Sequence, residues 1–228
     1  MEKCHQSSLS GAKPMIKVGI IPAAGSATRF GGIIKELLPL ADGRSLLEHA
    51  IERLSFCDRV VVVTSPGKMH QHRTNIRQRV NIIPQHGHEM WGAMQTGMNA
   101  YDADQYYLTM PDTWMYDSAF HGVPEIDFGY GYFITETPER FGVLVGDRFV
   151  DKPKDADVPA VAWGVLTWSK AVRDLWNEKR ITNYTDAINQ AIRDYSHRHW
   201  HIGPYFDCAD MNRYMELLDY MRKVNDES

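Results

Sequence analysis

Short apolar runs alternate with helical patterns through the first half of the chain. Four runs rich in β-branched or aromatic residues have the length of buried strands: residues 16–22, 59–64, 80–84 and 105–110. Residues 45–54 place their apolar side chains on one helical face, with Ser45 and Glu48 in capping-box spacing, and residues 90–101 form a second helical pattern. This alternation predicts right-handed βαβ units and a parallel sheet.

The pattern changes from Ile126 onward. Short β-like runs follow one another without a helical segment between them: residues 128–134, 142–145, 148–150 and 161–167. Helical patterns return at residues 170–178, 184–195 and 211–224. The sequence therefore predicts an α/β fold, in which a Rossmann-like, mostly parallel sheet is sandwiched by helices, with a small β-rich insertion and C-terminal helices.

Length and composition narrow the class of protein. The 228 residues suit a flexible tail at residues 1–14 and a single domain at residues 15–228. A formal net charge of -4 argues against a nucleic-acid partner, because counterion release requires concentrated Lys and Arg. Three cysteines without C-x-x-C spacing predict neither a disulfide framework nor structural zinc, and no apolar run is long enough to span a bilayer. We expect a cytoplasmic protein that does not bind membranes and whose anionic partners are small.

A glycine-rich turn follows the first predicted strand. Residues 23–32 (AAGSATRFGG) fit neither a Walker loop nor the dinucleotide fingerprint. Small residues nevertheless let backbone N–H groups approach phosphate oxygens, and Arg29 and Lys35 add positive charge, which favours a triphosphate ligand. The residues expected to contact it through the backbone are Ala23, Ala24, Gly25 and Ser26. Taken alone, a tight turn with solvated cations fits the same residues equally well.

Residues 19–40 (GIIPAAGSATRFGGIIKELLPL) resemble the signature of the sugar-phosphate nucleotidylyltransferases, which belong to the NDP-sugar pyrophosphorylase type. That signature is a strand, then Gly-x-Gly-Thr-Arg, then a lysine ahead of Leu-Leu-Pro. Ala27 stands where a glycine is usual, and the interval from Arg29 to Lys35 is shorter than in the hexose-phosphate enzymes. The short interval also occurs in cytidylyltransferases of isoprenoid and phosphocholine metabolism, so the substrate stays open.

Two later segments continue the resemblance on the nucleotide side. Gln85 and Gly92 are similar to the base-reading residues of the family, where a glutamine carboxamide and a glycine contact the nucleobase. Asp112, in Met-Pro-Asp-Thr, resembles the aspartate that binds magnesium, and it follows a predicted strand, where ligands of such sheets bind. A loop glutamine and a turn aspartate are the alternative interpretations without the family.

Three further matches fall on the acceptor side. Arg140-Phe141-Gly142-Val143, Asp151-Lys152-Pro153 and Trp163-Gly164-Val165 resemble the family's Tyr-Gly-Val, Glu-Lys-Pro and Gly-Ile-Tyr steps, in the same order. The resemblance implies that Lys152 contacts the acceptor phosphate and that Asp151 holds a sugar hydroxyl, with Gly142 and Trp163 beside them. Asp207, in Tyr-Phe-Asp-Cys-Ala, resembles the second magnesium ligand, although Cys208 and Ala209 replace the usual small polar residues.

The resemblance implies a magnesium-dependent (Mg²⁺) enzyme that couples a nucleoside triphosphate to a sugar 1-phosphate and releases pyrophosphate. Its nucleotide-binding half would be about residues 15–125 and its acceptor-binding half about 126–210. Arg29, Lys35 and Lys152 are the implied catalytic cations, and Asp112 and Asp207 the implied metal ligands. Two alternatives stay open: a cytidylyltransferase acting on an alcohol phosphate, and a non-catalytic nucleotide-sugar-binding regulator. Homo-oligomer formation is also open.

Overall fold

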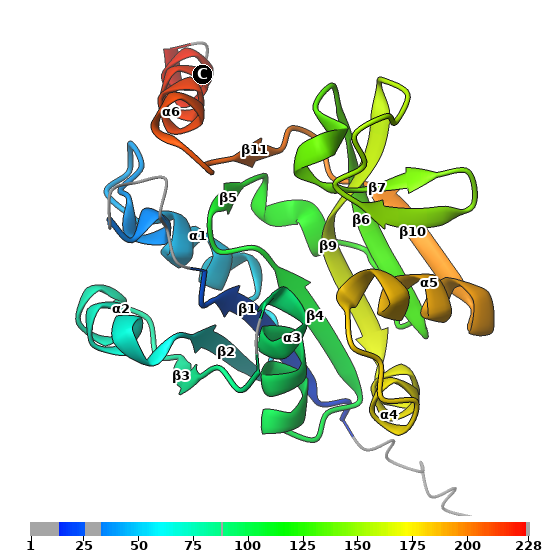
Figure 1. Ribbon diagram of the computed structural model, residues 1–228. Helices are drawn as coiled ribbons and strands as arrows, with labels where there is room; N and C mark the ends of the chain where they lie inside the picture. Colours follow the sequence, from blue (N-terminus) through cyan, green and yellow to red (C-terminus); the bar gives the residue numbers. More distant parts are fainter. Residues whose placement is uncertain (1–13, 26–32, 88, 227–228) are drawn as a thin grey trace, which may run out of the picture.

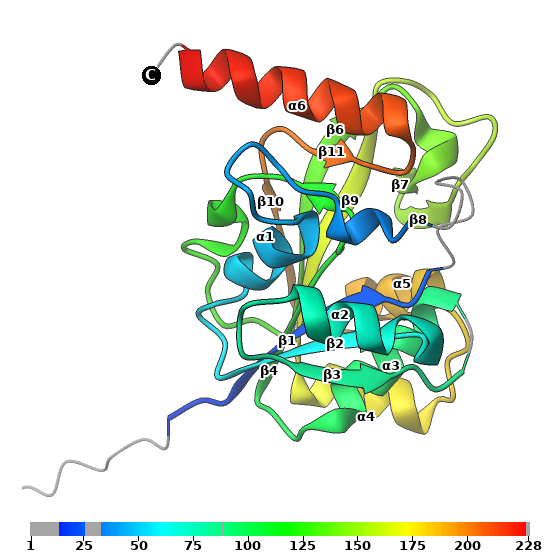
Figure 2. The same ribbon diagram turned by 90° about the vertical axis from the view of Figure 1, so that its left-hand side faces the viewer.

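A single large sheet organises the chain (Figures 1 and 2). The computed structural model describes residues 14–25, 33–87 and 89–226, so the predicted tail lies outside the described residues except for Pro14. Within these ranges nine strands form the sheet, seven of them in the order β10-β6-β9-β4-β1-β2-β3. The strands are β1 (Lys17–Ala23), β2 (Arg59–Thr64), β3 (Asn81–Pro84), β4 (Gln105–Thr109), β6 (Phe128–Thr135), β7 (Gly142–Val145), β8 (Arg148–Asp151), β9 (Ala160–Ser169) and β10 (His197–His201).

The first half of the sheet is parallel, as the alternating pattern predicted. β1 pairs in parallel with β2 and β4, and β2 pairs in parallel with β3. The β-rich stretch differs from the predicted insertion, because β6 and β9 join the central sheet and β9 runs antiparallel to both of its neighbours. Only the β7–β8 hairpin stands off this path. β9 is buried along almost its whole length, as a central strand covered on both faces must be.

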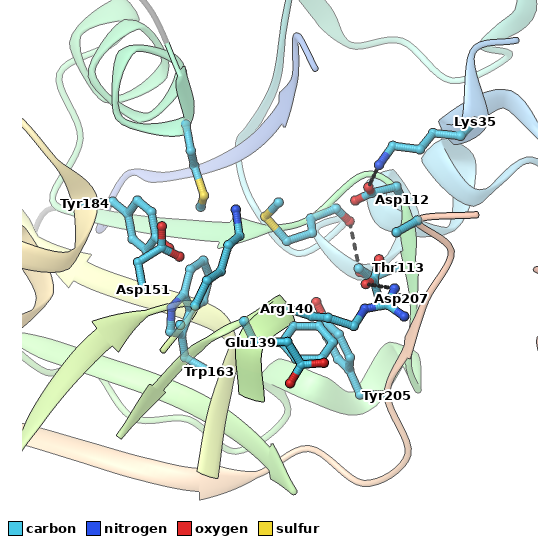
Figure 3. Close-up of a pocket in the computed structure, with 16 residues that line it drawn as sticks. Lys35, Asp112, Thr113, Glu139, Arg140, Asp151, Trp163, Tyr184, Tyr205 and Asp207 are labelled. Carbon is cyan, nitrogen blue, oxygen red and sulfur yellow. Dashed lines mark hydrogen bonds and ion pairs between the residues drawn. The ribbon is translucent and has the colours of Figure 1, made fainter. Parts of the chain in front are cut away.

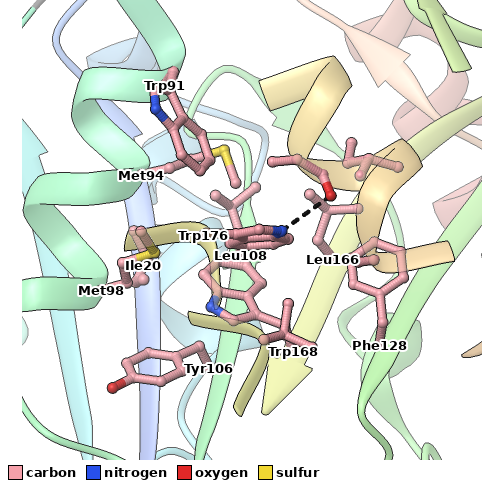
Figure 4. Close-up of a cluster of buried hydrophobic side chains, with 14 of the residues drawn as sticks. Ile20, Trp91, Met94, Met98, Tyr106, Leu108, Phe128, Leu166, Trp168 and Trp176 are labelled. Carbon is pink, nitrogen blue, oxygen red and sulfur yellow. Dashed lines mark hydrogen bonds between the residues drawn. The ribbon is translucent and has the colours of Figure 1, made fainter. Parts of the chain in front are cut away.

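Helices cover both faces of the sheet. α3 (Glu89–Ala100), α4 (Lys170–Glu178) and α5 (Tyr184–Asp194) cover one face, and α1 (Leu46–Arg53) with the 3-10 turn η4 (Asp117–Phe120) covers the other. β1 alternates between the two layers: Ile20 packs with the α3 side and Ile21 with the α1 side. Figure 4 shows the first layer, where Trp168 and Trp176 are fully buried.

α1 begins where the sequence predicted, because its first turn is capped by side chains. Glu48 N–H donates to Ser45 Oγ at 3.2 Å, and Ser45 N–H donates to Glu48 Oε2 at 2.9 Å. Such a capping box satisfies two of the N–H groups that a helix start leaves unpaired. The capping box thereby defines the residue at which α1 begins.

Two aspects of the fold have little signal in the sequence. α2 (Met69–Asn75) and β10 are mostly polar, because α2 lies at the β3 end of the sheet and β10 is its other edge. Outside the large sheet, β5 (Thr113–Trp114) pairs antiparallel with β11 (Phe206–Asp207), and α6 (Met211–Asp226) follows directly. None of the helices in the described ranges has the length and apolar character needed to cross a membrane.

Candidate active site

Two cavities open at the carboxyl edge of the parallel strands, where such sheets bind ligands. One, of about 440 Å³, is lined by residues that follow β1, β3 and β4. The other, of about 350 Å³, lies between this edge and the β7–β8 hairpin. Lys35, Met90, Met110 and Asp112 line both cavities. The two spaces therefore meet at a lysine and an aspartate that were both predicted as site residues.

The first cavity collects the residues predicted to bind the nucleotide. Ala23, Ala24 and Gly25 line it at the end of β1, and Gln85 lines it at the end of β3. Because β1 and β3 both flank β2 in parallel, their carboxyl ends lie at one edge. Ser26 and Arg29 lie outside the described residues, so the predictions made for them stay predictions.

Gln85 is oriented by its own loop. Its Nε2 donates to Glu89 O at 2.7 Å and to Gly87 O at 3.4 Å. These two carbonyl groups occupy the donor end of the carboxamide, so that Oε1 is left as the group that can accept a hydrogen bond from a ligand. This geometry favours a role of Gln85 as a hydrogen-bond acceptor toward a ligand.

Gly92 lies beneath the Gln85 loop. A Cβ at this position would stand 2.9 Å from His86 O and 3.0 Å from Gln85 Nε2. A side chain there would therefore displace the loop that carries Gln85. Direct contact of Gly92 with a base stays a prediction, whereas its packing under the loop is visible in the structure.

The second cavity collects the residues predicted to bind the acceptor. Gly142, Asp151, Lys152 and Trp163 all line it. In Figure 3, Asp151, Trp163 and Tyr184 gather on the side away from Lys35 and Asp112. The Tyr184 hydroxyl donates to Asp151 Oδ1, and burial followed by this carboxylate raises the pKa of Tyr184. This wall of the cavity is therefore both aromatic and acidic.

Backbone geometry fixes the positions of the residues in the second cavity that are predicted to bind the acceptor. Gly142 pairs with Asp151 across the β7–β8 hairpin. Lys152 follows with a φ of 47°, a left-handed conformation that is uncommon for a residue with a side chain, and its N–H donates to Phe141 O at 2.8 Å. A Cβ on Gly142 would approach Trp163 Nε1 to 2.4 Å, so only glycine lets the indole lie here.

Two ion pairs line the second cavity, and one of them lies where the two cavities join. Lys35 Nζ pairs with Asp112 Oδ2, and Arg140 Nη2 donates to Asp207 Oδ2 at 2.7 Å (Figure 3). All four side chains are largely buried, between 13% and 22% exposed. Two of the four residues are the predicted metal ligands, and one is a predicted catalytic cation.

The small β5–β11 sheet brings the two aspartates together. Asp207 pairs with Thr113, the residue after Asp112, and Cys208 N–H donates to Asp112 O at 3.0 Å. Asp207 does not follow a strand of the large sheet, because β11 lies outside that sheet. Its neighbour Cys208 is fully buried, and burial raises the pKa of this thiol to about 12, which rules against a nucleophilic thiolate.

Burial and neighbouring charges shift the pKa values of Asp207 and Lys35. Burial, and then repulsion from Asp112, raise the pKa of Asp207 despite the nearby Arg140 guanidinium. Burial acts to lower the pKa of Lys35, but attraction to Asp112 and Asp207 outweighs it and the pKa is raised. Two neighbouring carboxylates that repel each other in a partly buried place are stabilised by a cation between them.

The donor set also fits Mg²⁺. No group of three or more His, Cys, Asp or Glu side chains able to hold a metal ion occurs within the described ranges. Mg²⁺ does not require such a group, because it is commonly bound by one or two carboxylates together with substrate phosphates and water. Asp112 and Asp207 would be those carboxylates.

Several residues that shape the site were not singled out from the sequence. Glu36, which is 1% exposed and follows Lys35, accepts from Lys68 Nζ at 2.8 Å and lies 3.2 Å from His72 Nε2. Burial acts to raise the pKa of Glu36, yet the bonds from His72 and Lys68 lower it. This buried cluster fixes the turn η2 (Lys35–Leu37) that presents Lys35. Neither Lys68 nor His72 stands in a recognisable motif.

Arg53 braces the segment that carries Asp112. It is 1% exposed, and its guanidinium donates to Thr109 Oγ1 at 2.8 Å and to Met115 O at 3.3 Å, on either side of Asp112. Burial lowers the pKa of Arg53 to about 10, which still leaves the side chain charged at neutral pH.

We expect Arg53→Met to lower the free energy of unfolding by about 2 to 4 kcal/mol, because it keeps much of the side-chain volume but leaves two buried acceptors unpaired. Urea denaturation of wild type, Arg53→Met and the control Arg222→Met checks this. Arg222 is an exposed arginine on α6, and its replacement should cost little. Equal stability of all three proteins would show that Arg53 does not brace this segment.

Known proteins that are similar to this chain have the names of nucleotidyltransferases. Residues 19–121 match the MobA-like NTP transferase domain family. Two curated relatives are 2-C-methyl-D-erythritol 4-phosphate cytidylyltransferases. The one from Ralstonia nicotianae is 44% identical over 64 residues, covering 26% of this chain and 25% of its own length. The one from Psychrobacter cryohalolentis is 28% identical over 137 residues, covering 56% and 45%. The chain thus spans less than half the length of either relative.

A solved structure matches over nearly the whole chain. It is described as a glucose-1-phosphate thymidylyltransferase from Bacillus anthracis, in complex with sucrose, and it superposes with a TM-score of 0.75 at 16% identity. The match covers 90% of this chain and 95% of that one, which establishes a shared fold. Residues 19–121 of the chain are therefore similar to the MobA-like NTP transferase domain, and the chain shares the fold of a structure described as a thymidylyltransferase.

Proposed function

We propose that this protein transfers a nucleoside monophosphate from a pyrimidine nucleoside triphosphate, UTP or dTTP, to a sugar 1-phosphate. The observation that carries the proposal is the junction of two cavities at Lys35 and Asp112. One cavity ends in the small residues after β1, which suit phosphates, and the other holds Lys152 beside an aromatic, acidic wall, which suits a hydroxylated ring.

The proposed reaction is an in-line displacement. An oxygen of the acceptor phosphate forms a bond to the α-phosphorus, and the bond from that phosphorus to pyrophosphate breaks. Lys35 would bind the triphosphate at the junction, Lys152 would bind the acceptor phosphate, and Asp151 would hold a hydroxyl of the acceptor. Arg29 is proposed to act with Lys35. Asp112 and Asp207 would hold Mg²⁺, which neutralises phosphate charge when bound.

A cytidylyltransferase is the second candidate, because both curated relatives transfer from CTP by name. A screen for pyrophosphate release tests the two together: UTP, dTTP, CTP, ATP and GTP, each with sugar 1-phosphates and with alcohol phosphates. Release with a sugar 1-phosphate supports the proposal, and release only with CTP and an alcohol phosphate supports the second candidate. Tight nucleotide-sugar binding without any pyrophosphate release would instead indicate a regulatory protein.

We expect UTP or dTTP to be used with a kcat/KM at least about tenfold above that for ATP, because a donor N3–H of uracil or thymine can meet Oε1 of Gln85, whose Nε2 bonds to the loop. Adenine has an acceptor nitrogen at its corresponding edge. Competition assays with equimolar nucleotides measure the preference. Equal use of ATP would rule out base selection by Gln85. CTP is the decisive comparison, because a cytosine amino group could also donate to this oxygen.

A further inference from the structure

Arg140 is a largely buried cation of the second cavity to which neither the sequence nor the proposed function gives a task. It ends the 3-10 turn η5 (Pro138–Arg140), and its side chain is 22% exposed. It lines the same cavity as Lys152, and its described polar contact there is the 2.7 Å bond to Asp207. A guanidinium held inside a substrate cavity by a single carboxylate is available for another anion once that carboxylate is engaged elsewhere.

Each of the two ion pairs engages one carboxylate oxygen, Oδ2, of a predicted metal ligand. Lys35 pairs with one predicted metal ligand, and Arg140 pairs with the other. A divalent cation and these basic side chains compete for the same carboxylates, because Mg²⁺ binds carboxylate oxygens directly. Asp112 and Asp207, if they held a divalent cation, would therefore pair more weakly with Lys35 and Arg140. Charge repulsion between the cation and the guanidinium acts in the same direction.

We propose that Arg140 is a second binding residue for the acceptor phosphate, and that Asp207 holds it in place until a divalent cation takes over that carboxylate. This inference rests on the proposed function. A guanidinium suits the task, because its fork of N–H groups matches two phosphate oxygens. The exchange would conserve the number of ion pairs, because Asp207 would pair with the cation and Arg140 with the phosphate.

The neighbourhood of Arg140 supports a phosphate in this cavity. Phe141, the next residue, accepts the N–H of Lys152 at 2.8 Å, so the two cations come from adjoining segments of one wall. Of the acidic residues on that side, Asp151 is engaged by Tyr184, and Glu139 is exposed at the rim. A phosphate between Arg140 and Lys152 would thus meet two cations, which suits its double negative charge.

The coupling predicts opposite effects of one substitution. We expect Arg140→Gln to bind Mn²⁺ about threefold to tenfold more tightly in the absence of phosphate, because a competing cation is gone. The same variant should bind inorganic phosphate about tenfold more weakly in the presence of Mn²⁺, because a charged hydrogen bond is lost. Electron paramagnetic resonance measures free Mn²⁺, and calorimetry measures phosphate binding, both on the full chain.

The control is Arg213→Gln. Arg213 lies on α6 near Asp207, lines a neighbouring cavity and has its own partner, Glu216, at 2.9 Å. Arg213→Gln removes the same charge as Arg140→Gln, but from a side chain that has its own partner. We therefore expect neither the Mn²⁺ affinity nor the phosphate affinity to change more than about twofold. Arg140→Lys keeps the charge but not the fork. It should restore most of the Mn²⁺ affinity of the wild type and only part of its phosphate affinity, and it serves if Arg140→Gln does not fold.

Two results would overturn the inference separately from the proposed function. If the wild type releases pyrophosphate and Arg140→Gln still binds phosphate as tightly as wild type with Mn²⁺ present, Arg140 is not a phosphate ligand. If Arg140→Gln weakens Mn²⁺ binding, the exchange is wrong. Absence of Mn²⁺ and phosphate binding in the wild type, together with absence of pyrophosphate release, would overturn both proposals.

Discussion

Asp112→Asn and Asp207→Asn should each lower magnesium-dependent turnover by at least about a thousandfold, because the metal that they are proposed to hold supplies several kcal/mol of charge stabilisation. The double variant should lose little more than either single variant. The two carboxylates lie side by side through the β5–β11 pairing, and two ligands of one ion act as a unit.

The measurement is steady-state kinetics with a magnesium titration of each variant. Asp147→Asn is the control, because Asp147 is an exposed carboxylate in the β7–β8 turn. It should leave both turnover and the magnesium titration unchanged. Near-wild-type activity of Asp207→Asn, with an unaltered magnesium dependence, would show that Asp207 is not the second ligand and that its pairing with Arg140 is structural.

Lys35→Ala should lower kcat by about a hundredfold to a thousandfold, equivalent to roughly 2.7 to 4 kcal/mol of barrier, because its ammonium group is proposed to stabilise charge on the transferring phosphates. Folding should change much less. Lys35 lies at the cavity junction, and the turn that carries it is anchored separately through Glu36. Arg29→Ala should behave in the same way, whereas Lys152→Ala should chiefly raise the KM for the acceptor.

Turnover with each substrate varied, together with thermal melting, separates these effects. Lys179→Ala is the matched control, since Lys179 is an exposed lysine paired with Asp194 on the α4–α5 side. A loss of less than about tenfold in Lys35→Ala would favour the solvated-cation interpretation of the glycine-rich turn. An equal loss of melting temperature and activity would assign Lys35 a structural role through its pair with Asp112.

Much of the central sheet could be predicted from the chain because its strands are buried on both faces. β2 is RVVVVT and was predicted to the residue, and the capping box placed the start of α1. Elements at the edges of the sheet were missed because they are not buried on both faces. β10 is HRHWH, with one face in water, so neither an apolar run nor clear alternation marks it.

Local sequence by itself determined many of the residues that line the candidate site, because a small turn after β1 and carboxylates or lysines in family-like steps are readable as motifs. Tertiary structure alone decided how they combine. The pairing of β5 with β11 joins Asp112 to Asp207 across 95 positions of the chain, and it rests on two residues of strand on each side, too few to leave a pattern. The buried partners Arg53, Arg140 and Lys68 likewise look like ordinary surface cations in the sequence. Only packing removes them from water, and a cation without water must find a protein partner.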